Sequence, residues 1–350
     1  MTHRVAVLAG DGVGPEVIGE ARKAVDAMGL PVAWTEFPWG SAWYREHGRM
    51  MPEDALDTLR GHDAVLLGAI GDPSVPDHVA LWGTILEIRQ GLDLWANLRP
   101  CRLLAGIPTP LAGRSPDDVD FLVVRENTEG EYAGVGGRSH RGFDSEVALE
   151  TSVFTRSGVR RVVRYAFELA ASRRGTLTSA TKSNASRFGY VLWDEVVQET
   201  AAEFEGVRVE RVLVDALAAR MVRDPTGLDV VVASNLFGDI LTDLAAAMQG
   251  GMGMAASANV APGSDRPGVF EPVHGSAPDI AGDGIANPAG AVWSAALMLE
   301  HLGEGEAAGN LMKALETVCR EGPRTRDVGG NATTAEVGDA VAAALSASPR

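Results

Sequence analysis

Asp239 and Asp243 are the first candidates for chemistry in this sequence. They lie four residues apart in NLFGDILTDL (235–244), so on a helix both carboxylates project from one face. A divalent cation would remove their mutual repulsion, and Mg²⁺ and Mn²⁺ prefer oxygen ligands of this kind. The same spacing fits two aspartates that complement the helix dipole, and spacing alone favours this structural interpretation.

Three arginines are candidate anion-binding groups. Arg89 ends an expected helix, where it could instead cap carbonyl groups, Arg99 precedes a proline that imposes extended backbone, and Arg125 closes an apolar strand. Each alone is more often a surface or structural arginine. Two or three together could bind a small dicarboxylate, because a guanidinium group binds a carboxylate through two parallel hydrogen bonds.

Lys182, Tyr132 and Asp215 could move protons or complete a metal site. Lys182 follows a strand in TSATKSN, and neighbouring positive charge would lower its pKa and make it usable as a base. Tyr132 could act as an acid, and Asp215 could be a third carboxylate ligand or a helix N-cap. The structural alternatives are a solvated lysine and a half-buried tyrosine beside a turn.

The glycine- and proline-rich stretch FEPVHGSAPDIAGDGIANP (270–288) has few side chains to pack. Its backbone could therefore approach a nucleotide closely. His274 could stack on an adenine, and Asp279 could bind a ribose diol and repel a 2′-phosphate, which favours NAD over NADP. The alternative is a connecting loop without a ligand, although long loops in compact domains are usually functional.

Strands that alternate with helices must position these groups, and they indicate an α/β fold. Strands are expected at 4–9, 32–37, 64–69, 120–125, 146–152, 175–179, 207–212 and 230–233. Helices are expected from about 15 to 28 and at 52–60, 82–90, 156–171, 193–204, 235–244, 290–302, 306–320 and 334–346. The segment 91–110 is expected to be extended, and 251–290 mostly loop. Ser234 and Asn235 offer side-chain oxygens that could cap the helix at 235–244.

Gly10, Gly12 and Gly14 follow the first strand and suggest a dinucleotide fingerprint. The pattern G-x-G-x-x-G fails, however, because its sixth position is Pro15. Glu36 even lies near the expected position of a ribose-binding acid. We interpret the run as a tight strand-to-helix turn with the proline in the first helical turn.

Composition limits the class of protein. The chain has 350 residues, 45% of them hydrophobic, and a net charge of -16, which fits a soluble globular protein of two domains or one large domain. No apolar run reaches the length of a membrane span, and the N-terminal one is too short for a signal peptide. Cys101 and Cys319 lie far apart, so we expect a cytoplasmic protein without disulfides. The charge argues against nucleic-acid and membrane partners, and an anionic substrate would need a local cluster of arginines.

Taken together, these motifs resemble the β-decarboxylating dehydrogenases, the family of isocitrate, isopropylmalate, homoisocitrate and tartrate/D-malate dehydrogenases. The likeness runs from GDGVGPEV to TRDVGG (325–330), with Ala9 where the family usually has proline. Between them stand, in order, NLRP (97–100), RENTEGEY (125–132), TKSN (181–184), NLFGDILTDL and EPVHGSAPDIAGDGIANP (271–288). The resemblance implies an isopropylmalate dehydrogenase-like two-domain fold with a shared mixed sheet, not a standard Rossmann fold. Residues 1–98 plus 253–350 would bind the cofactor, and 99–252 would bind substrate and metal and form the dimer.

The resemblance also implies a role for each candidate residue. The three arginines would hold the substrate carboxylates, and Asp239 and Asp243 would bind Mg²⁺ or Mn²⁺ with Asp215 of the other subunit. Lys182, also from the partner, would be the base and Tyr132 the proton donor. NAD would lie on His274, Gly275, Ser276, Ala277, Asp279, Ile280 and Asn287. The implied assembly is a homodimer with shared active sites, and K⁺ is a candidate monovalent cofactor.

Substrate choice depends on the helix before Arg89. In isopropylmalate dehydrogenases this helix carries an acidic residue and a leucine pair, whereas here WGTILEIR places Trp82 at the acidic position, with Thr84 and Ile85 nearby. With VGGR (135–138) and TKSN, this is more similar to tartrate/D-malate dehydrogenases, so we expect D-malate or tartrate as substrate. Ile85 and Leu86 leave an apolar wall, which keeps 3-isopropylmalate as the alternative. A catalytically silent regulatory homologue is disfavoured, because the expected lysine and aspartates are all present.

Overall fold

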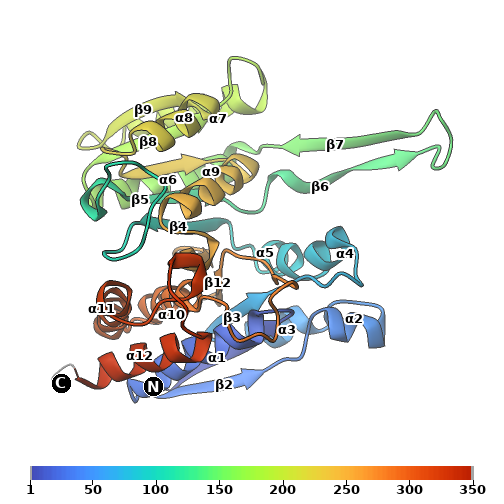
Figure 1. The fold of residues 1–350 in the computed structure, drawn as a ribbon. Helices are drawn as coiled ribbons and strands as arrows, with labels where there is room; N and C mark the ends of the chain where they lie inside the picture. Colours follow the sequence, from blue (N-terminus) through green and yellow to red (C-terminus); the bar gives the residue numbers. More distant parts are fainter. Residues whose placement is uncertain (1, 348–350) are drawn as a thin grey trace.

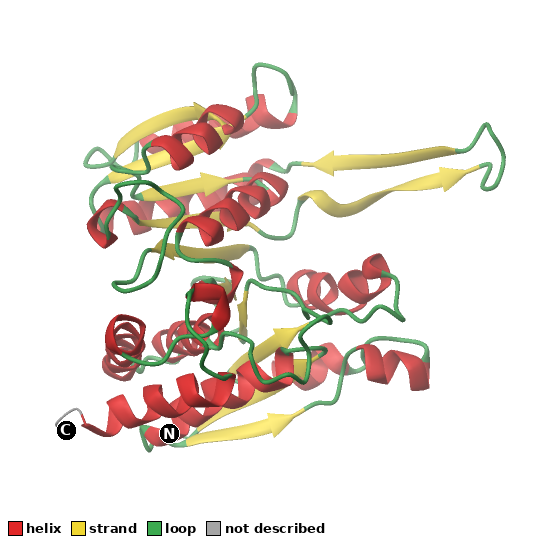
Figure 2. Ribbon diagram, viewed as in Figure 1, coloured by secondary structure: helices red, strands yellow, loops and turns green. Residues whose placement is uncertain are grey.

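The computed structural model describes residues 2–347. In this range ten strands form one mixed sheet, and two further strands form a separate arm. The sheet strands are β1 (His3–Gly10), β2 (Val32–Glu36), β3 (Ala64–Ala69), β4 (Ala96–Arg102), β5 (Asp120–Glu126), β8 (Thr176–Thr181), β9 (Arg208–Leu213), β10 (Val230–Ala233), β11 (Ala256–Val260) and β12 (Gly268–Pro272). The arm consists of β6 (Gly130–Ser139) and β7 (Val147–Val153), and it extends away from the rest of the molecule (Figures 1 and 2).

Helices flank both faces of the sheet. They are α1 (Gly14–Ala27), α2 (Ser41–His47), α3 (Ala55–Arg60), α4 (Asp77–Leu81), α5 (Glu87–Gly91), α6 (Arg156–Ser172), α7 (Gly189–Ala201), α8 (Val214–Arg223), α9 (Asn235–Met248), α10 (Ala289–His301), α11 (Gly305–Glu321) and α12 (Thr334–Ala347). A π-helical turn (Trp82–Leu86) joins α4 to α5, and three short 3-10 turns lie at Pro116–Asp118, Met252–Met254 and Arg326–Val328. Across residues 2–347, no helix has the length and apolar character that a membrane span requires.

The sheet runs without interruption through two halves of the molecule. Its strand order is β2-β1-β3-β12-β11-β4-β5-β10-β8-β9. The pairings β12–β11, β11–β4 and β4–β5 in the middle are antiparallel, and those on either side are parallel. Figure 1 shows both ends of the chain in the lower half and the middle of the chain in the upper half. The α/β fold with a shared mixed sheet is thus confirmed, and the division into 1–98 plus 253–350 and 99–252 stays a prediction that this arrangement supports.

Two expectations about secondary structure are wrong, and a third is incomplete. The stretch 251–290 is mostly loop, as expected, but it also contributes β11 and β12, whose residues are all buried in the middle of the sheet. Asp215 is not a helix N-cap: Leu213 occupies that position and Asp215 lies in the first turn of α8. Neither Ser234 nor Asn235 caps α9 with its side chain; the Ser234 hydroxyl instead bonds that of Tyr190 at 2.7 Å.

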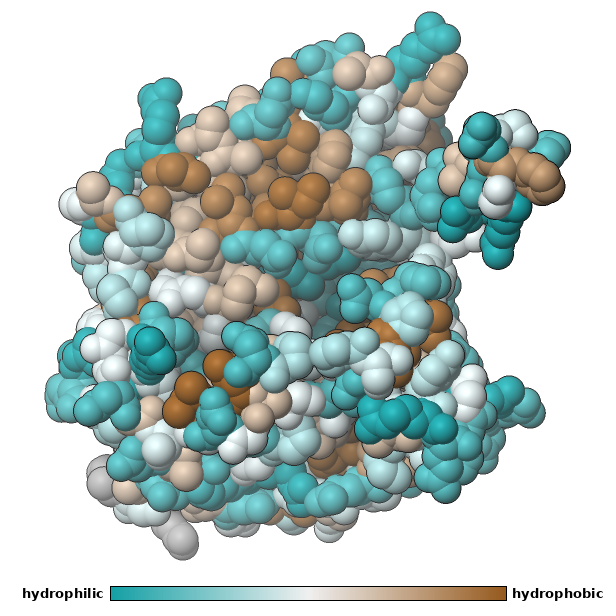
Figure 3. Space-filling model, turned by 45° about the vertical axis from the view of Figure 1, so that its right-hand side comes forward, coloured by the Kyte–Doolittle hydropathy of each residue, from teal (hydrophilic) through white to brown (hydrophobic). Residues whose placement is uncertain are grey.

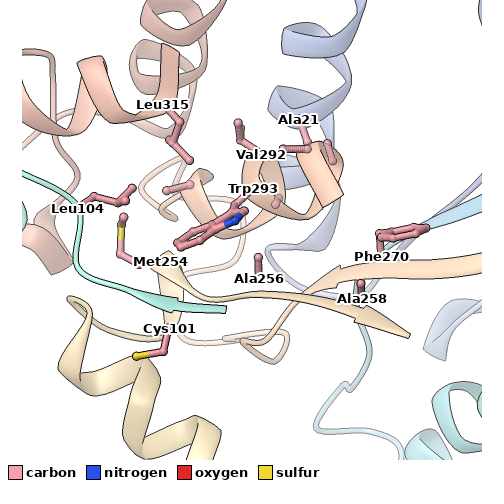
Figure 4. Close-up of a cluster of buried hydrophobic side chains, with 14 of the residues drawn as sticks. Ala21, Cys101, Leu104, Met254, Ala256, Ala258, Phe270, Val292, Trp293 and Leu315 are labelled. Carbon is pink, nitrogen blue, oxygen red and sulfur yellow. The ribbon is translucent and has the colours of Figure 1, made fainter. Parts of the chain in front are cut away.

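The largest core cluster extends along the sheet, from α1 and α10 in the lower half to β5, β10 and α9 in the upper half. Figure 4 shows Trp293 of α10 at its centre, with Val292 and Leu315 on the helical side and Ala256 and Ala258 of β11 on the sheet side. α10 is apolar around its whole circumference, as expected of a helix covered on all sides. This core fixes β11 and β12, whose ends lead into the candidate site.

The glycine run after β1 packs against the 270–288 segment. Val13 N donates to Ser276 O at 2.9 Å, and Gly12 has a positive φ of 56°. A Cβ on Gly12 would lie 1.9 Å from Ser276 O. The run is therefore a tight turn that holds this segment in place, and α1 begins there with Pro15 in its first turn.

Gly12→Ala is expected to destabilise the protein by about 2–4 kcal/mol, because it adds strain at a positive φ and a clash with backbone. Gly19→Ala is the matched control. Gly19 is exposed on α1, which follows the turn, and nothing lies within 4 Å of a Cβ added there. We expect this change to stabilise the protein by about 0.5–1 kcal/mol. Chemical denaturation measures both, and equal effects of the two substitutions would contradict the packing role of the turn.

Candidate active site

A cleft of about 270 Å³ lies between the two halves, where the ends of β3 and β12 face β4, β5 and α9. Figure 3 shows the surface hollowed between the upper and lower parts of the molecule. Many of the predicted site residues line this cleft: Ile85, Arg89, Arg99, Arg125, Tyr132, Asp239, Asp243, His274 and Gly275. They come from both ends and the middle of the chain, so the fold gathers most of the motifs at one place.

Arg89 and Arg99 are buried in the cleft with donors to spare. Arg89 of α5 donates from Nη2 to Glu271 Oε1 at 2.7 Å, and it does not cap its helix. Arg99 of β4 donates from Nη1 to Thr242 Oγ1 at 2.7 Å. The Nε atoms of both arginines are buried without a hydrogen-bond partner. A carboxylate in the cleft would offset the positive charge of these two buried guanidinium groups, which is costly to bury without a counterion.

Arg125, near the end of β5, is fixed by α9. It donates from Nε and Nη2 to Asn235 Oδ1 at 3.0 and 2.7 Å, and from Nη1 to Asp239 Oδ1. Gly238 permits this contact, since a Cβ there would lie 2.5 Å from the Arg125 Cγ atom. The first turn of α9 thus orients both an arginine and an aspartate toward the cleft.

Asp239 and Asp243 project from the same face of α9, as the four-residue spacing predicts. Arg99 Nη1 lies 3.5 Å from Asp239 Oδ1 and 3.8 Å from Asp243 Oδ1. The Tyr132 hydroxyl donates to Asp239 Oδ2 at 3.3 Å. The two carboxylates therefore stand between the arginines and solvent, with oxygen atoms of the kind that Mg²⁺ and Mn²⁺ prefer.

The cleft separates the pKa values of the two aspartates. Burial alone would raise the pKa of Asp239, but Arg125, Arg99 and Arg89 outweigh it and hold this pKa below its usual range. Burial and the neighbouring Asp239 raise the pKa of Asp243. Burial, followed by Asp239, also raises the pKa of Tyr132, so its hydroxyl keeps its proton at neutral pH. Arg125 has its pKa lowered by burial and then by Arg99, which reflects the repulsion among guanidinium groups that an anion would relieve.

Lys182 and Asp215 form a pair outside this cleft. Lys182 Nζ lies 2.8 Å from Asp215 Oδ2, and the hydrogen bond from the lysine lowers the pKa of the aspartate. Neither residue lines the cleft of the same chain. Within residues 2–347, no three His, Cys, Asp or Glu side chains gather to hold a metal ion. One chain alone thus offers the carboxylates of Asp239 and Asp243 to a metal ion, while Glu271 in the same cleft accepts from Arg89.

The loop after β12 borders the lower side of the cleft. His274 donates from Nδ1 to Gly275 O at 2.8 Å, while its Nε2 is buried without a partner and burial lowers its pKa. Ala277 has a positive φ of 42°, and Asp279 is exposed. Asn287 donates to Asp327 Oδ2 at 3.0 Å and accepts from Ala289 N at 3.0 Å, which anchors the end of the loop. The loop thus presents a neutral imidazole and an exposed carboxylate, a donor set that fits an adenosine.

Comparison with known proteins decides the family. The family described as Isocitrate/isopropylmalate dehydrogenase matches residues 4–341. The chain belongs to this family. It is therefore an oxidoreductase, an NAD(P)-dependent decarboxylating dehydrogenase, and members of the family generally act as dimers on a small carboxylate.

Individual relatives cover the whole chain. A Bacillus subtilis protein named "Probable tartrate dehydrogenase/decarboxylase" is 51% identical over 97% of this chain and 97% of its own length. D-malate dehydrogenase (decarboxylating) of Escherichia coli is 49% identical over 97% of this chain and 98% of its own length. The crystal structure of isocitrate dehydrogenase from Methylococcus capsulatus has a TM-score of 0.90 at 36% identity and covers 98% of this chain and 99% of that one. The expected family and its fold are thus confirmed.

Of the three residues expected to contact the substrate from the helix before Arg89, only one lines the cleft of this dehydrogenase. Ile85 lines the cleft with Leu81 and Leu86, whereas Trp82 and Thr84 are absent from its lining. Thr84 is fully buried, and the Trp82 ring lies where a Cβ on Gly134 of the arm would meet it at 2.9 Å. The roles of Trp82 and Thr84 in substrate recognition stay predictions.

Sequence reasoning missed three polar residues that orient the arginines of this dehydrogenase. Glu271 bonds Arg89, Asn235 bonds Arg125 and Thr242 bonds Arg99. The sequence marks these residues as candidates for a functional role only by their positions inside the motifs EPVHG and NLFGDILTDL. Their partners lie 182, 110 and 143 positions away in the sequence, so nothing local pairs them.

Proposed function

We propose that this enzyme catalyses the NAD- and divalent-metal-dependent oxidative decarboxylation of D-malate, of tartrate, or of both. The observation that carries the proposal is the group of three buried arginines beside Asp239 and Asp243, with the Nε donors of Arg89 and Arg99 unpaired. The relatives named for tartrate and D-malate, at about half identity over their full lengths, favour these substrates.

The charges of the cleft fit a cation and a dicarboxylate together. The three guanidinium groups face the carboxylates of Asp239, Asp243 and Glu271, so these side chains nearly balance one another. A bound Mg²⁺ or Mn²⁺ would leave a net charge of about plus two, which a dianionic substrate neutralises. Neither ligand alone would balance the site, so we expect them to bind cooperatively.

Each residue then has a role in the reaction. When bound, the cation would polarise the substrate hydroxyl and the adjacent carboxylate, and NAD⁺ would accept the hydride. Arg89, Arg99 and Arg125 would hold the carboxylates. Lys182 of the partner subunit would accept the hydroxyl proton, and Tyr132, whose hydroxyl stays protonated, would return a proton to carbon after carbon dioxide leaves.

The position of Lys182 and Asp215 supports an active site shared within a homodimer. The pair does not line the cleft of its own chain, and within residues 2–347 no third acidic or histidine side chain joins Asp239 and Asp243 to hold a metal ion. Val222 of α8 and Ile240 of α9 are 53% and 56% exposed, so the helices that carry Asp215 and the two aspartates present apolar side chains at the surface. Figure 3 shows apolar surface gathered on the upper half of the molecule, and a second copy of the chain would cover it.

Steady-state rates with D-malate, tartrate and 3-isopropylmalate, each with NAD⁺ and Mn²⁺, test the proposed substrate. We expect kcat/KM to be highest for D-malate or tartrate. A strong preference for 3-isopropylmalate, which the apolar wall of Leu81, Ile85 and Leu86 would accommodate, would overturn this choice.

Two changes to the same assay test the cofactors. Replacing K⁺ by Na⁺ tests the expected monovalent ion, and replacing NAD⁺ by NADP⁺ tests the role proposed for Asp279.

Mn²⁺ affinity is expected to fall as the pH is lowered from neutral into the acid range in which aspartates take up protons, because protons compete for the ligand carboxylates. Asp243 sets the pH at which this fall in affinity begins. Its pKa is raised by burial and by Asp239, so it takes up a proton at a higher pH than an ordinary aspartate. The shift of the melting temperature with Mn²⁺ concentration measures the affinity at each pH. An affinity that is constant over this range would contradict a role for Asp243 as a ligand.

A further inference from the structure

A chain of buried side-chain amides crosses the middle of the sheet and ends at Arg89. Its central member is Asn259 of β11, which is fully buried. Asn259 Oδ1 accepts hydrogen bonds from Asn97 Nδ2 at 2.8 Å and from Asn127 Nδ2 at 3.0 Å. Asn259 Nδ2 donates to Val269 O at 3.1 Å and to Glu271 Oε1 at 2.9 Å. The amide thus uses both lone pairs and both N–H groups, an arrangement that neither a carboxylate nor an apolar side chain can reproduce.

The two ends of this chain reach different halves of the molecule. Glu271 Oε1 accepts from both Asn259 and Arg89, so the amide fixes the carboxylate oxygen that fixes the guanidinium group. On the other side, Asn97 lies opposite Arg125 in the pairing of β4 and β5 and two residues before Arg99 on the same strand. Asn127 follows Arg125 by two residues.

We propose that Asn259 is a positioning residue that sets the orientation of Arg89 through Glu271 and ties it to the strands that carry Arg99 and Arg125. The inference rests on the proposed function in one respect, namely that Arg89 binds a carboxylate of the substrate. A dicarboxylate has a fixed distance between its charged ends, so its binding depends on the spacing of the arginines that hold it. Asn259 lies outside every motif that identified the family.

Asn259→Asp tests the inference with little change in volume. The variant keeps acceptors for Asn97 and Asn127 but loses both donors and places a carboxylate against Glu271, which displaces the partner of Arg89. We expect KM for the dicarboxylate to rise about tenfold, as for a charged group that loses a buried hydrogen bond, while KM for NAD⁺ changes less than about twofold. The substrate is whichever of D-malate, tartrate and 3-isopropylmalate the wild-type enzyme oxidises fastest, so a wrong substrate choice does not affect the test.

Ser257→Ala is the matched control. Ser257 is also fully buried on β11 and lies opposite Glu271 in the pairing of β11 and β12, but its hydroxyl accepts from Asn97 Nδ2 at 2.7 Å and not from Arg89 or Asn259. We expect this variant to change neither KM by more than about twofold. If Asn259→Asp fails to fold, Asn259→Ala removes the same donors without adding a charge. For this variant we expect KM for the dicarboxylate to rise about threefold.

An equal rise in KM for the dicarboxylate in the Ser257 and Asn259 variants would overturn the inference, because a general loosening of the sheet would explain both. A rise that affects NAD⁺ as much as the dicarboxylate would also overturn it. A substrate preference other than D-malate or tartrate in the wild-type enzyme would overturn the proposed substrate and leave the positioning role standing.

Discussion

Lys182→Met is expected to lower kcat by about 10³-fold, since positioned general bases contribute rate factors of about 10²–10⁴. The lysine is partly shielded, with 28% of its side chain exposed, and its Nζ lies 2.8 Å from Asp215 Oδ2. Methionine is unbranched and only one atom shorter than lysine, but it cannot accept a proton. NAD⁺ and Mn²⁺ binding, measured by the rise in melting temperature that each ligand causes, should remain.

Two further lysine variants sharpen this experiment. Lys182→Arg should not restore turnover, because a guanidinium group does not release its proton near neutral pH and so cannot serve as a base. Lys313→Met is the control, since this lysine is exposed on α11, and its turnover should equal that of the wild type. Turnover near the wild-type rate in Lys182→Met would exclude this residue as the base.

The sequence predicts well those features of the site that are local. The four-residue spacing of Asp239 and Asp243 places both on one face of α9, Arg99 lies in extended backbone before its proline, and Arg125 lies near the end of its strand, all as expected. Helical and strand periodicity act over a few residues, so such statements need no knowledge of the rest of the fold.

The features that the sequence did not predict depend on distant contacts. β11 and β12 are short strands between glycines and prolines, and they are stable because β3 and β4 pair with their outer edges and α10 covers them. The pairs Arg89–Glu271 and Asn97–Asn259 join residues 182 and 162 positions apart. A sequence without an alignment carries no signal for such pairs, although buried polar residues need partners once burial is known.

Asp239→Asn is expected to abolish turnover, because this carboxylate meets three functional groups at once. It binds Arg125, lies 3.5 Å from Arg99 Nη1 and accepts from the Tyr132 hydroxyl at 3.3 Å. The amide would lose the charge that a divalent cation needs and would leave Arg125 without its counterion. We expect kcat to fall by about 10³-fold or more, as when a ligand and an electrostatic contact are lost together. The Mn²⁺-dependent rise in melting temperature should disappear, which Lys182→Met should retain.

The two inactive variants together test whether subunits share their active sites. In a dimer of one Lys182→Met subunit and one Asp239→Asn subunit, a shared site can combine the intact aspartate of the first with the intact lysine of the second. Heterodimers purified through two different tags should then have about half of the wild-type activity, since one of the two symmetric sites is whole. If each site were built from a single chain, both sites would lack an essential group and activity would be absent.

The reciprocal heterodimer gives the opposite pattern and excludes trivial explanations. One subunit carries both substitutions and its partner is wild type, so the number of altered residues is the same. With shared sites, each site receives one defective group and activity should be absent, whereas with separate sites about half should remain. Because Lys182 and Asp215 lie outside the cleft of their own chain, we expect activity in the first heterodimer and none in the second.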